Sequence, residues 1–127
     1  MTDSTPFADA RYVNLETFKK DGGGVKTPVW AAPLDGKLVI FSAGDAFKVK
    51  RLRRDPHARV AACDVRGKVS GDWREATGRI LEEPADIERA HAALRRKYGW
   101  QMAMGDFFAG LTGRTKKRAW LEISFPA

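Results

Sequence analysis

Five basic residues lie within seven positions of one short segment, which follows a glycine-containing loop: Ser42-Ala-Gly-Asp-Ala-Phe-Lys-Val-Lys-Arg-Leu-Arg-Arg-Asp-Pro56. Asp45 is of the type that caps a helix N-terminus, where unpaired N–H groups attract anions. Lys48 and Arg51 would share one helix face and could hold a phosphate, Arg51 as a planar fork and Lys48 as a point charge. The same pattern also fits a solvated basic face. The P-loop pattern GxxxxGK[ST] is absent.

Other reactive side chains are few. Cys63 lies inside an expected strand, and His57 is six positions away and outside that strand. A buried structural cysteine is therefore favoured over a catalytic Cys/His pair. Asp64 follows as a candidate polar site residue. Paired carboxylates, HExxH and GxSxG are absent, so an enzyme of this sequence would rely on a cofactor for its reactivity.

The composition describes one small domain over residues 1–127 with a formal charge of +7. Such a charge favours an anionic partner, and its concentration in three short clusters favours a local anion site. A single cysteine excludes an internal disulfide, and no spacing of Cys and His indicates a metal site. The N-terminus is polar, and no stretch reaches the ~18 apolar residues of a membrane span, so we expect a cytoplasmic protein.

The pattern of apolar residues and turn residues predicts six strands and three helices. Gly22-Gly23-Gly24 marks a hairpin turn, and Pro28 indicates an edge strand or a bulge. The expected strands cover residues 12–18, 25–32, 37–42, 59–65, 73–81 and 119–125, and the expected helices cover 45–54, 84–98 and 100–111. Six strands joined mostly by hairpins predict a mainly β fold, a small antiparallel barrel with appended helices.

Five segments occur in the order found in one protein family. They are Tyr12–Gly22, Thr27–Trp30, Lys48–Pro56, Val60–Asp64 with Arg66-Gly67, and Arg96–Gly99. Over about residues 8 to 125 the chain resembles the actinobacterial deazaflavin-dependent branch of the pyridoxamine-phosphate-oxidase-like split barrels. The resemblance implies a six-stranded split β-barrel and a homodimer with two cofactor clefts at its interface. It also implies coenzyme F420, or FMN in some members.

The resemblance assigns roles to particular residues. The family's phosphate-binding lysine lies eight residues before the strand-leading proline, which is Lys48 before Pro56 here. An arginine precedes this lysine in the pyridoxamine oxidases, whereas this chain has Phe47, which disfavours pyridoxamine phosphate oxidation and favours F420 over FMN. The other implied cofactor-binding residues are the helpers Lys50 and Arg51, the ring-lining Lys26, Thr27, Pro28, Val29 and Trp30, the nearby Ser42 and Ala43, and the pair Cys63 and Asp64, typical of the deazaflavin branch.

Three functions follow from these observations. The leading hypothesis is an F420-dependent oxidoreductase that transfers a hydride from the reduced deazaflavin to an electron-poor small molecule, with no side chain acting as a nucleophile. The second is a protein that carries FMN or F420 without catalysis. The third is a basic nucleic-acid-binding barrel, which would require aromatic residues interleaved with basic ones on adjacent strands. The strongest basic cluster is expected on a helix, which disfavours that third function.

Overall fold

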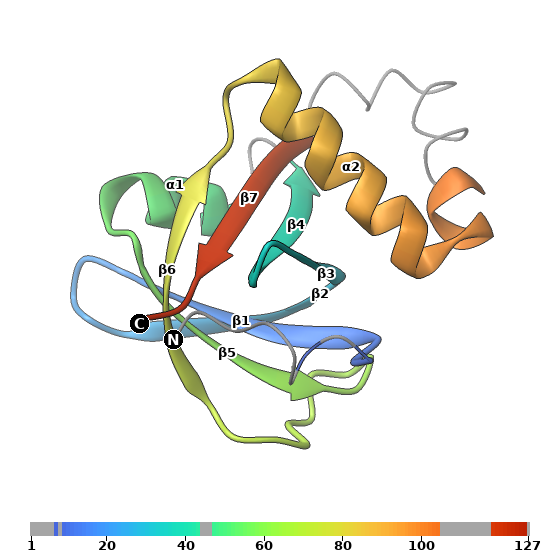
Figure 1. The fold of residues 1–127 in the computed structure, drawn as a ribbon. Coiled ribbons are helices and arrows are strands. Elements are labelled where there is room, and N and C mark those ends of the chain that lie inside the picture. The colour runs from blue at the N-terminus through green and yellow to red at the C-terminus, as the bar shows by residue number, and fades with distance from the viewer. Residues whose placement is uncertain (1–6, 8, 44–46, 105–117, 127) are drawn as a thin grey trace.

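A computed structural model describes residue 7 and residues 9–43, 47–104 and 118–126 of the chain (Figure 1). Its strands form one antiparallel sheet in the order β2-β1-β5-β6-β7-β4-β3. The strands are β1 (Tyr12–Phe18), β2 (Gly24–Val29), β3 (Ala31–Leu34), β4 (Lys37–Ala43), β5 (His57–Cys63), β6 (Arg74–Ile80) and β7 (Arg118–Ser124), and the helices are α1 (Phe47–Arg54) and α2 (Pro84–Tyr98).

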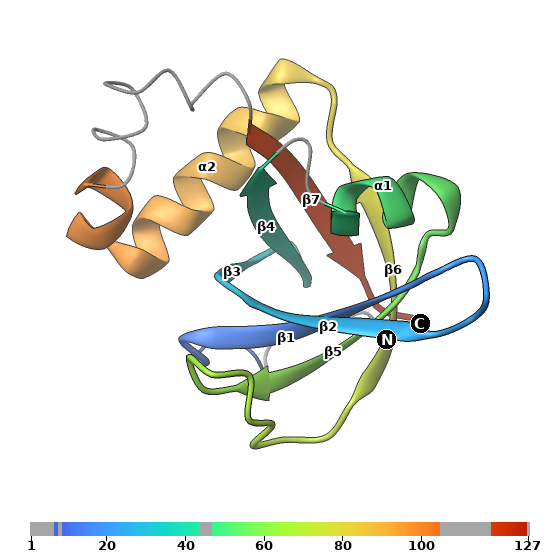
Figure 2. The same ribbon diagram turned by 180° about the vertical axis from the view of Figure 1, so that it is seen from behind.

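The sheet closes into a barrel because its two edge strands are consecutive in the chain. β2 pairs with β1, β3 pairs with β4, and only Trp30 separates β2 from β3. The run from residue 24 to residue 34 therefore leaves one end of the sheet and joins the other, as the two ribbon views show (Figures 1 and 2). The sequence predicted six strands with one continuous strand over 25–32. The described residues form seven strands instead, because this run changes partner at Trp30.

Two apolar cores occupy the two sides of this sheet. The first fills the barrel and takes alternate residues of the strands, such as Val13 and Leu15 of β1 and Leu121 and Ile123 of β7. The second lies between the outer face of β3, β4 and β7 and the buried face of α2, which contributes Ala90, Ala93, Leu94 and Tyr98. This division follows from the two-residue period of strands and the 3.6-residue period of helices.

The predicted helix ends are largely confirmed. α2 begins at Pro84, whose missing N–H would have no partner within the helix, and ends at Tyr98, directly before Gly99, whose φ is 57°. α1 ends at Arg54, directly before Asp55-Pro56. Residues 100–104 are helical; the rest of the predicted helix 100–111 and the proposed cap Asp45 lie outside the described residues. β5 begins and ends two residues earlier than the predicted 59–65.

α1 packs on the barrel through a small contact surface. Its buried residues Val49 and Leu52 face the sheet, and Leu52 lies over Gly78 of β6. A Cβ atom at Gly78 would lie 3.0 Å from Leu52 Cδ2 and 3.1 Å from Ile123 Cδ1. The absence of a side chain at Gly78 therefore sets how closely the basic helix approaches the barrel. In the described part of the chain, no helix is long and apolar enough to cross a membrane.

This contact predicts that Gly78→Val destabilises the protein. The added atoms would overpack the space between α1 and β7, which costs about 1–3 kcal/mol in the free energy of unfolding. Gly71→Val is the matched control, because a Cβ atom there meets only Ala62 Cβ at 3.7 Å. Urea denaturation of both variants measures the difference, and equal losses would contradict the proposed contact.

Candidate functional site

Helix α1 places two of its cations close together. Lys48 is half-buried, and its pKa is lowered, first by burial and then by the positive charge of Arg51. Arg51 is fixed in turn, because its Nε donates a hydrogen bond to Thr17 Oγ1 of β1 at 2.8 Å. Lys50 is exposed, with its Nζ 5.4 Å from the centre of the Phe47 ring. Lys48 and Arg51 thus form a partly desolvated pair of like charges.

Cations of the turn between β1 and β2 lie opposite the cations of α1, and together they line an open pocket of about 330 Å³. We call this the basic pocket; its lining residues are Lys19, Lys20, Phe47, Lys50, Arg51 and Arg54. Both ribbon views place the turn between β1 and β2 beside the C-terminal end of α1 (Figures 1 and 2). Arg54 links the two elements by donating to the backbone carbonyl of Phe18. Sequence reasoning missed Lys19 and Lys20, because only the packing of α1 against β1 brings them to the helix.

The five predicted ring-lining residues do not share one surface. In β2, Lys26 and Pro28 are exposed, whereas Val29 is buried in the barrel core and Thr27 is half-buried. This alternation follows from the pleat, which sends neighbouring side chains to opposite faces. Lys26 lies against Trp73, with its Nζ 5.2 Å from the ring centre. A ligand ring could therefore contact the side chains of only some of these residues.

Trp30 belongs to an aromatic cluster at the seam between β2 and β3. Its ring stacks on Tyr98 of α2 with centres 4.4 Å apart and planes 7° apart, and it meets the edge of Phe41 at 6.3 Å. The Tyr98 hydroxyl accepts a hydrogen bond from the Ala31 N–H at 3.0 Å. Burial raises the pKa of Tyr98 to about 12. The orientation of Trp30 is thus set by α2, a contact that the sequence did not predict.

Lys97 links the seam between β2 and β3 to the segment before β1 by hydrogen bonds. Its Nζ donates to the carbonyls of Ala10 and Ala31 at 2.6 Å each and to that of Phe7 at 3.2 Å. Burial, and then the charge of Arg11, lowers the pKa of Lys97 to about 8. Three carbonyl acceptors account for the burial of this ammonium group.

The remaining predicted site residues lie at strand ends. Ser42 is buried and stands opposite Ala119, and Ala43 ends β4 opposite Arg118, four residues before α1 begins. Cys63 is buried at the end of β5, and burial, followed by the charge of Asp64, raises the pKa of its thiol. A raised pKa favours the thiol over the nucleophilic thiolate.

Asp64 organises the loop after β5. Its Oδ1 accepts hydrogen bonds from the backbone N–H groups of Arg66 and Lys68, both at 2.9 Å. The loop is attached to the barrel where Asn14 Nδ2 donates to the Gly67 carbonyl at 2.9 Å. The structure therefore gives Asp64 a role in shaping this turn, which sequence reasoning did not identify.

Comparisons with known proteins identify the fold. No protein-family model matches the chain, and no curated protein is similar to it in sequence. Solved structures do match: a heme storage protein from Vibrio cholerae has a TM-score of 0.70 at 10% identity, covering 94% of this chain and 84% of that one. A candidate pyridoxamine 5'-phosphate oxidase from Listeria innocua has a TM-score of 0.63 at 18% identity, covering 89% and 82%. The chain therefore has the same fold as these two proteins, consistent with the split β-barrel expected from the sequence.

A third solved structure shares this fold but carries a different name. It is a candidate 5-nitroimidazole antibiotic resistance protein from Bacteroides thetaiotaomicron, with a TM-score of 0.69 at 9% identity, covering 97% of this chain and 80% of that one. Identities this low show the fold alone, since one fold hosts many functions. The function must therefore be argued from the residues of this split barrel.

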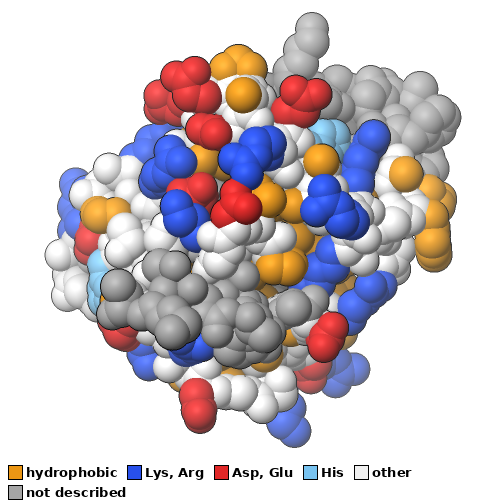
Figure 3. All heavy atoms as spheres, in the orientation of Figure 1, with side chains coloured by type: hydrophobic (Ala, Val, Ile, Leu, Met, Phe, Trp, Pro, Cys, Tyr) orange, Lys and Arg blue, Asp and Glu red, His pale blue; other side chains and the backbone are white. Residues whose placement is uncertain are grey.

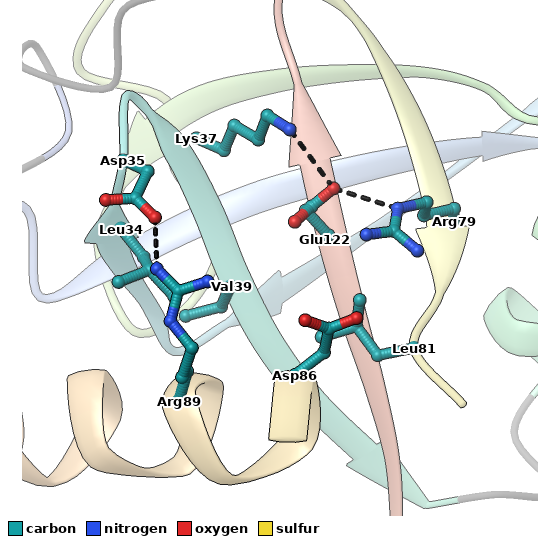
Figure 4. Close-up of a pocket in the computed structure, with 9 residues that line it drawn as sticks. All are labelled: Leu34, Asp35, Lys37, Val39, Arg79, Leu81, Asp86, Arg89 and Glu122. Carbon is teal, nitrogen blue, oxygen red and sulfur yellow. Dashed lines mark hydrogen bonds and ion pairs between the residues drawn. The ribbon is translucent and has the colours of Figure 1, made fainter. Parts of the chain in front are cut away.

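A second pocket of this split barrel, about 190 Å³ in volume, is lined by charges that neutralise one another (Figure 4). Glu122 of β7 accepts a hydrogen bond from Arg79 Nε at 2.9 Å and forms an ion pair with Lys37 at 3.5 Å, while Arg89 of α2 pairs with Asp35. The hydrogen bond with Glu122 is the main reason that the pKa of Arg79 is raised. The surface around β6, β7 and the start of α2 accordingly mixes acidic and basic side chains (Figure 3). Of these pairs, only Arg89–Asp35 links α2 to the sheet, at the turn between β3 and β4.

The half-buried ammonium group of Lys97 predicts a pH dependence of stability. Because its pKa falls from 10.5 to about 8 on folding, the unfolded chain binds more protons between these values. The free energy of unfolding should therefore rise with pH from about 8 towards 10.5, by on the order of 1 kcal/mol after solvent screening. Lys97→Met should lack this increase. Denaturation at pH 7.5, 8.5 and 9.5 measures it, and identical slopes for both proteins would contradict it.

Proposed function

We propose that this split barrel binds the phosphate of a flavin or deazaflavin cofactor through Lys48, and that it is an F420-dependent oxidoreductase. The observation that carries this proposal is the pairing of Lys48 with Arg51 at the start of α1. Two cations held together with partial loss of water repel each other, and burial further disfavours the charge of Lys48. A phosphate between them would relieve both costs.

The residues present fit such a group. Arg51 uses its Nε on Thr17, and within the part of the chain that the structure describes its two terminal nitrogens are available to a ligand. Lys48 is the second residue of α1, where the helix dipole favours an anion. The donor set of one guanidinium, one ammonium and a helix N-terminus is a common one for phosphate. Lys50, two positions further along, is a weaker contributor in this proposal.

The seam between β2 and β3 is the proposed place for the ring system. Trp30 is held by its stack on Tyr98, so it offers a rigid aromatic surface. Lys26 and Pro28, on the exposed face of β2, would contribute further contacts. A bound deazaflavin would supply the hydride, and the protein would bind and orient the cofactor and an electron-poor substrate.

The proposed assembly is a homodimer. Trp100 is 70% exposed and Met104, one helical turn later, is 48% exposed. Large apolar side chains presented together in this way suit a protein interface. A second copy of the chain would complete the cofactor cleft.

Lys48→Ala tests the phosphate site directly. A hydrogen bond to a charged group contributes about 1.5–3 kcal/mol, so this variant should bind the cofactor ~10- to 150-fold more weakly. Stability should change little, because the lost ammonium is already partly desolvated. Fluorescence titration with F420 at fixed ionic strength measures the effect.

Lys50→Ala is the control for this experiment. It removes the same charge from the same helix, but about 200° further around the axis from Lys48 (two residues at ~100° each). Its effect should therefore be smaller. If both variants bound the cofactor as well as the unaltered protein, the segment would be a solvated basic face.

A non-catalytic carrier is the second candidate function. The similarity to the heme storage protein of Vibrio cholerae favours it, because that split barrel is named for holding a cofactor. Titrating the purified protein with F420, FMN and hemin distinguishes the candidates. We expect F420 to bind most tightly, since Phe47 stands where the pyridoxamine oxidases have an arginine. Tighter binding of FMN or hemin would contradict the assignment, and F420 binding without turnover of any nitro or enone acceptor would favour a carrier.

A further inference from the structure

We propose that the basic pocket is a second binding site, which adjoins the cofactor site at Arg51, for a nucleotide-like ligand, a small molecule in which a flat ring is joined to two or more phosphate groups. This goes beyond the proposed cofactor site, with which the pocket shares Lys50 and Arg51 but not Lys48. The site combines the turn between β1 and β2 with the C-terminal half of α1.

The charge of the basic pocket is the first argument. Its described lining holds five cations and no carboxylate. The pocket around Glu122 is different, because there Lys37, Arg79 and Arg89 each pair with Glu122 or Asp35. The two acids nearest in sequence to the basic pocket bind backbone groups instead: Asp21 accepts from the Gly23 N–H and Asp55 from the His57 N–H. A ligand with several negative charges would relieve the repulsion among the five cations.

The two arginines of the basic pocket are held in place before any ligand binds. Arg51 Nε donates to Thr17 Oγ1, and an NH2 nitrogen of Arg54 donates to the Phe18 carbonyl. Each guanidinium keeps further N–H groups that can form forked bonds with phosphate oxygens. Prior fixation lowers the entropy lost on binding, which distinguishes these arginines from freely moving surface cations.

Phe47 supplies the apolar part of the basic pocket. Its side chain is 71% exposed, which is unusual for a large apolar residue, and it lies among the cations rather than in the core. An aromatic face beside phosphate-binding groups suits a ligand whose ring can stack on it. The volume of about 330 Å³ lies within the range of about 300–1,000 Å³ of small-molecule sites.

The test uses the full chain with ATP and inorganic tripolyphosphate as probes, measured by isothermal titration calorimetry at 50 mM salt. Removing two exposed cations in Lys19→Gln/Lys20→Gln should weaken both probes by ~2- to 30-fold. Phe47→Ala should weaken ATP and leave tripolyphosphate unchanged, because only ATP carries a ring. Arg53→Gln is the control: it removes one exposed charge of α1 that does not line the basic pocket, and should change both affinities less than ~2-fold.

Several results would overturn the proposal. They are the absence of saturable ATP binding, equal losses in Arg53→Gln and Lys19→Gln/Lys20→Gln, and equal affinity for ATP and tripolyphosphate. Much tighter binding of a single-stranded oligonucleotide than of ATP would also do so, since it would indicate an extended nucleic-acid surface.

Lys48→Ala separates this proposal from the cofactor proposal. We expect the variant to lose F420 affinity and to keep ATP affinity within ~2-fold. Loss of both ligands would make the basic pocket part of the cofactor site and overturn the second site alone. Unchanged binding of both would contradict the Lys48 phosphate site and leave the nucleotide site supported.

Discussion

The closure of the barrel at Trp30 is the constraint on which the rest of this structure depends. A strand at the edge of an open sheet leaves backbone N–H and C=O groups without partners. Here β2 pairs with β1 at one end of the sheet and β3 pairs with β4 at the other, and a single residue, Trp30, connects β2 to β3. Tyr98 fixes this residue from α2 through a ring stack and a hydrogen bond to Ala31. The closure of the barrel, the placement of α2 and the orientation of Trp30 therefore depend on the same contacts of Tyr98.

The position of α1 follows from the same closure. Once the barrel is formed, Gly78 leaves a shallow place on β6 into which Leu52 fits, and the helix lies against β1 as well. The contact with β1 gives Arg51 and Arg54 their hydrogen-bond acceptors. It also brings the tip of the first hairpin to the helix, so that cations distant in sequence surround one pocket. The positive charge of α1, which is local in the sequence, is thus joined in the structure by the cations of the turn between β1 and β2.

Local sequence patterns predicted the helices and strands well, but they did not predict the contacts between elements that are distant in sequence. α2 was predictable because Pro84 and Gly99 mark its ends and its apolar residues recur at helical spacing. The break of the second predicted strand at Trp30 was not, because both halves have the composition of one strand and only their partners differ. The approach of Lys20 to α1 depends on packing between distant segments, which no local pattern reports. The resemblance named Trp30 and Lys48, but not the contacts that hold them.

Lys97 connects parts of the molecule that share no strand pairing. Its ammonium group binds carbonyls from the segment before β1 and from the first residue of β3 at the same time. A displacement of the Phe7–Ala10 segment or of Ala31 would therefore alter the hydrogen bonds that Lys97 Nζ makes to the other. The segment around Phe7 and Ala10 consequently acts as a remote part of the barrel seam. A reporter attached near the beginning of the chain would sense events at Trp30, although it lies outside every site considered above.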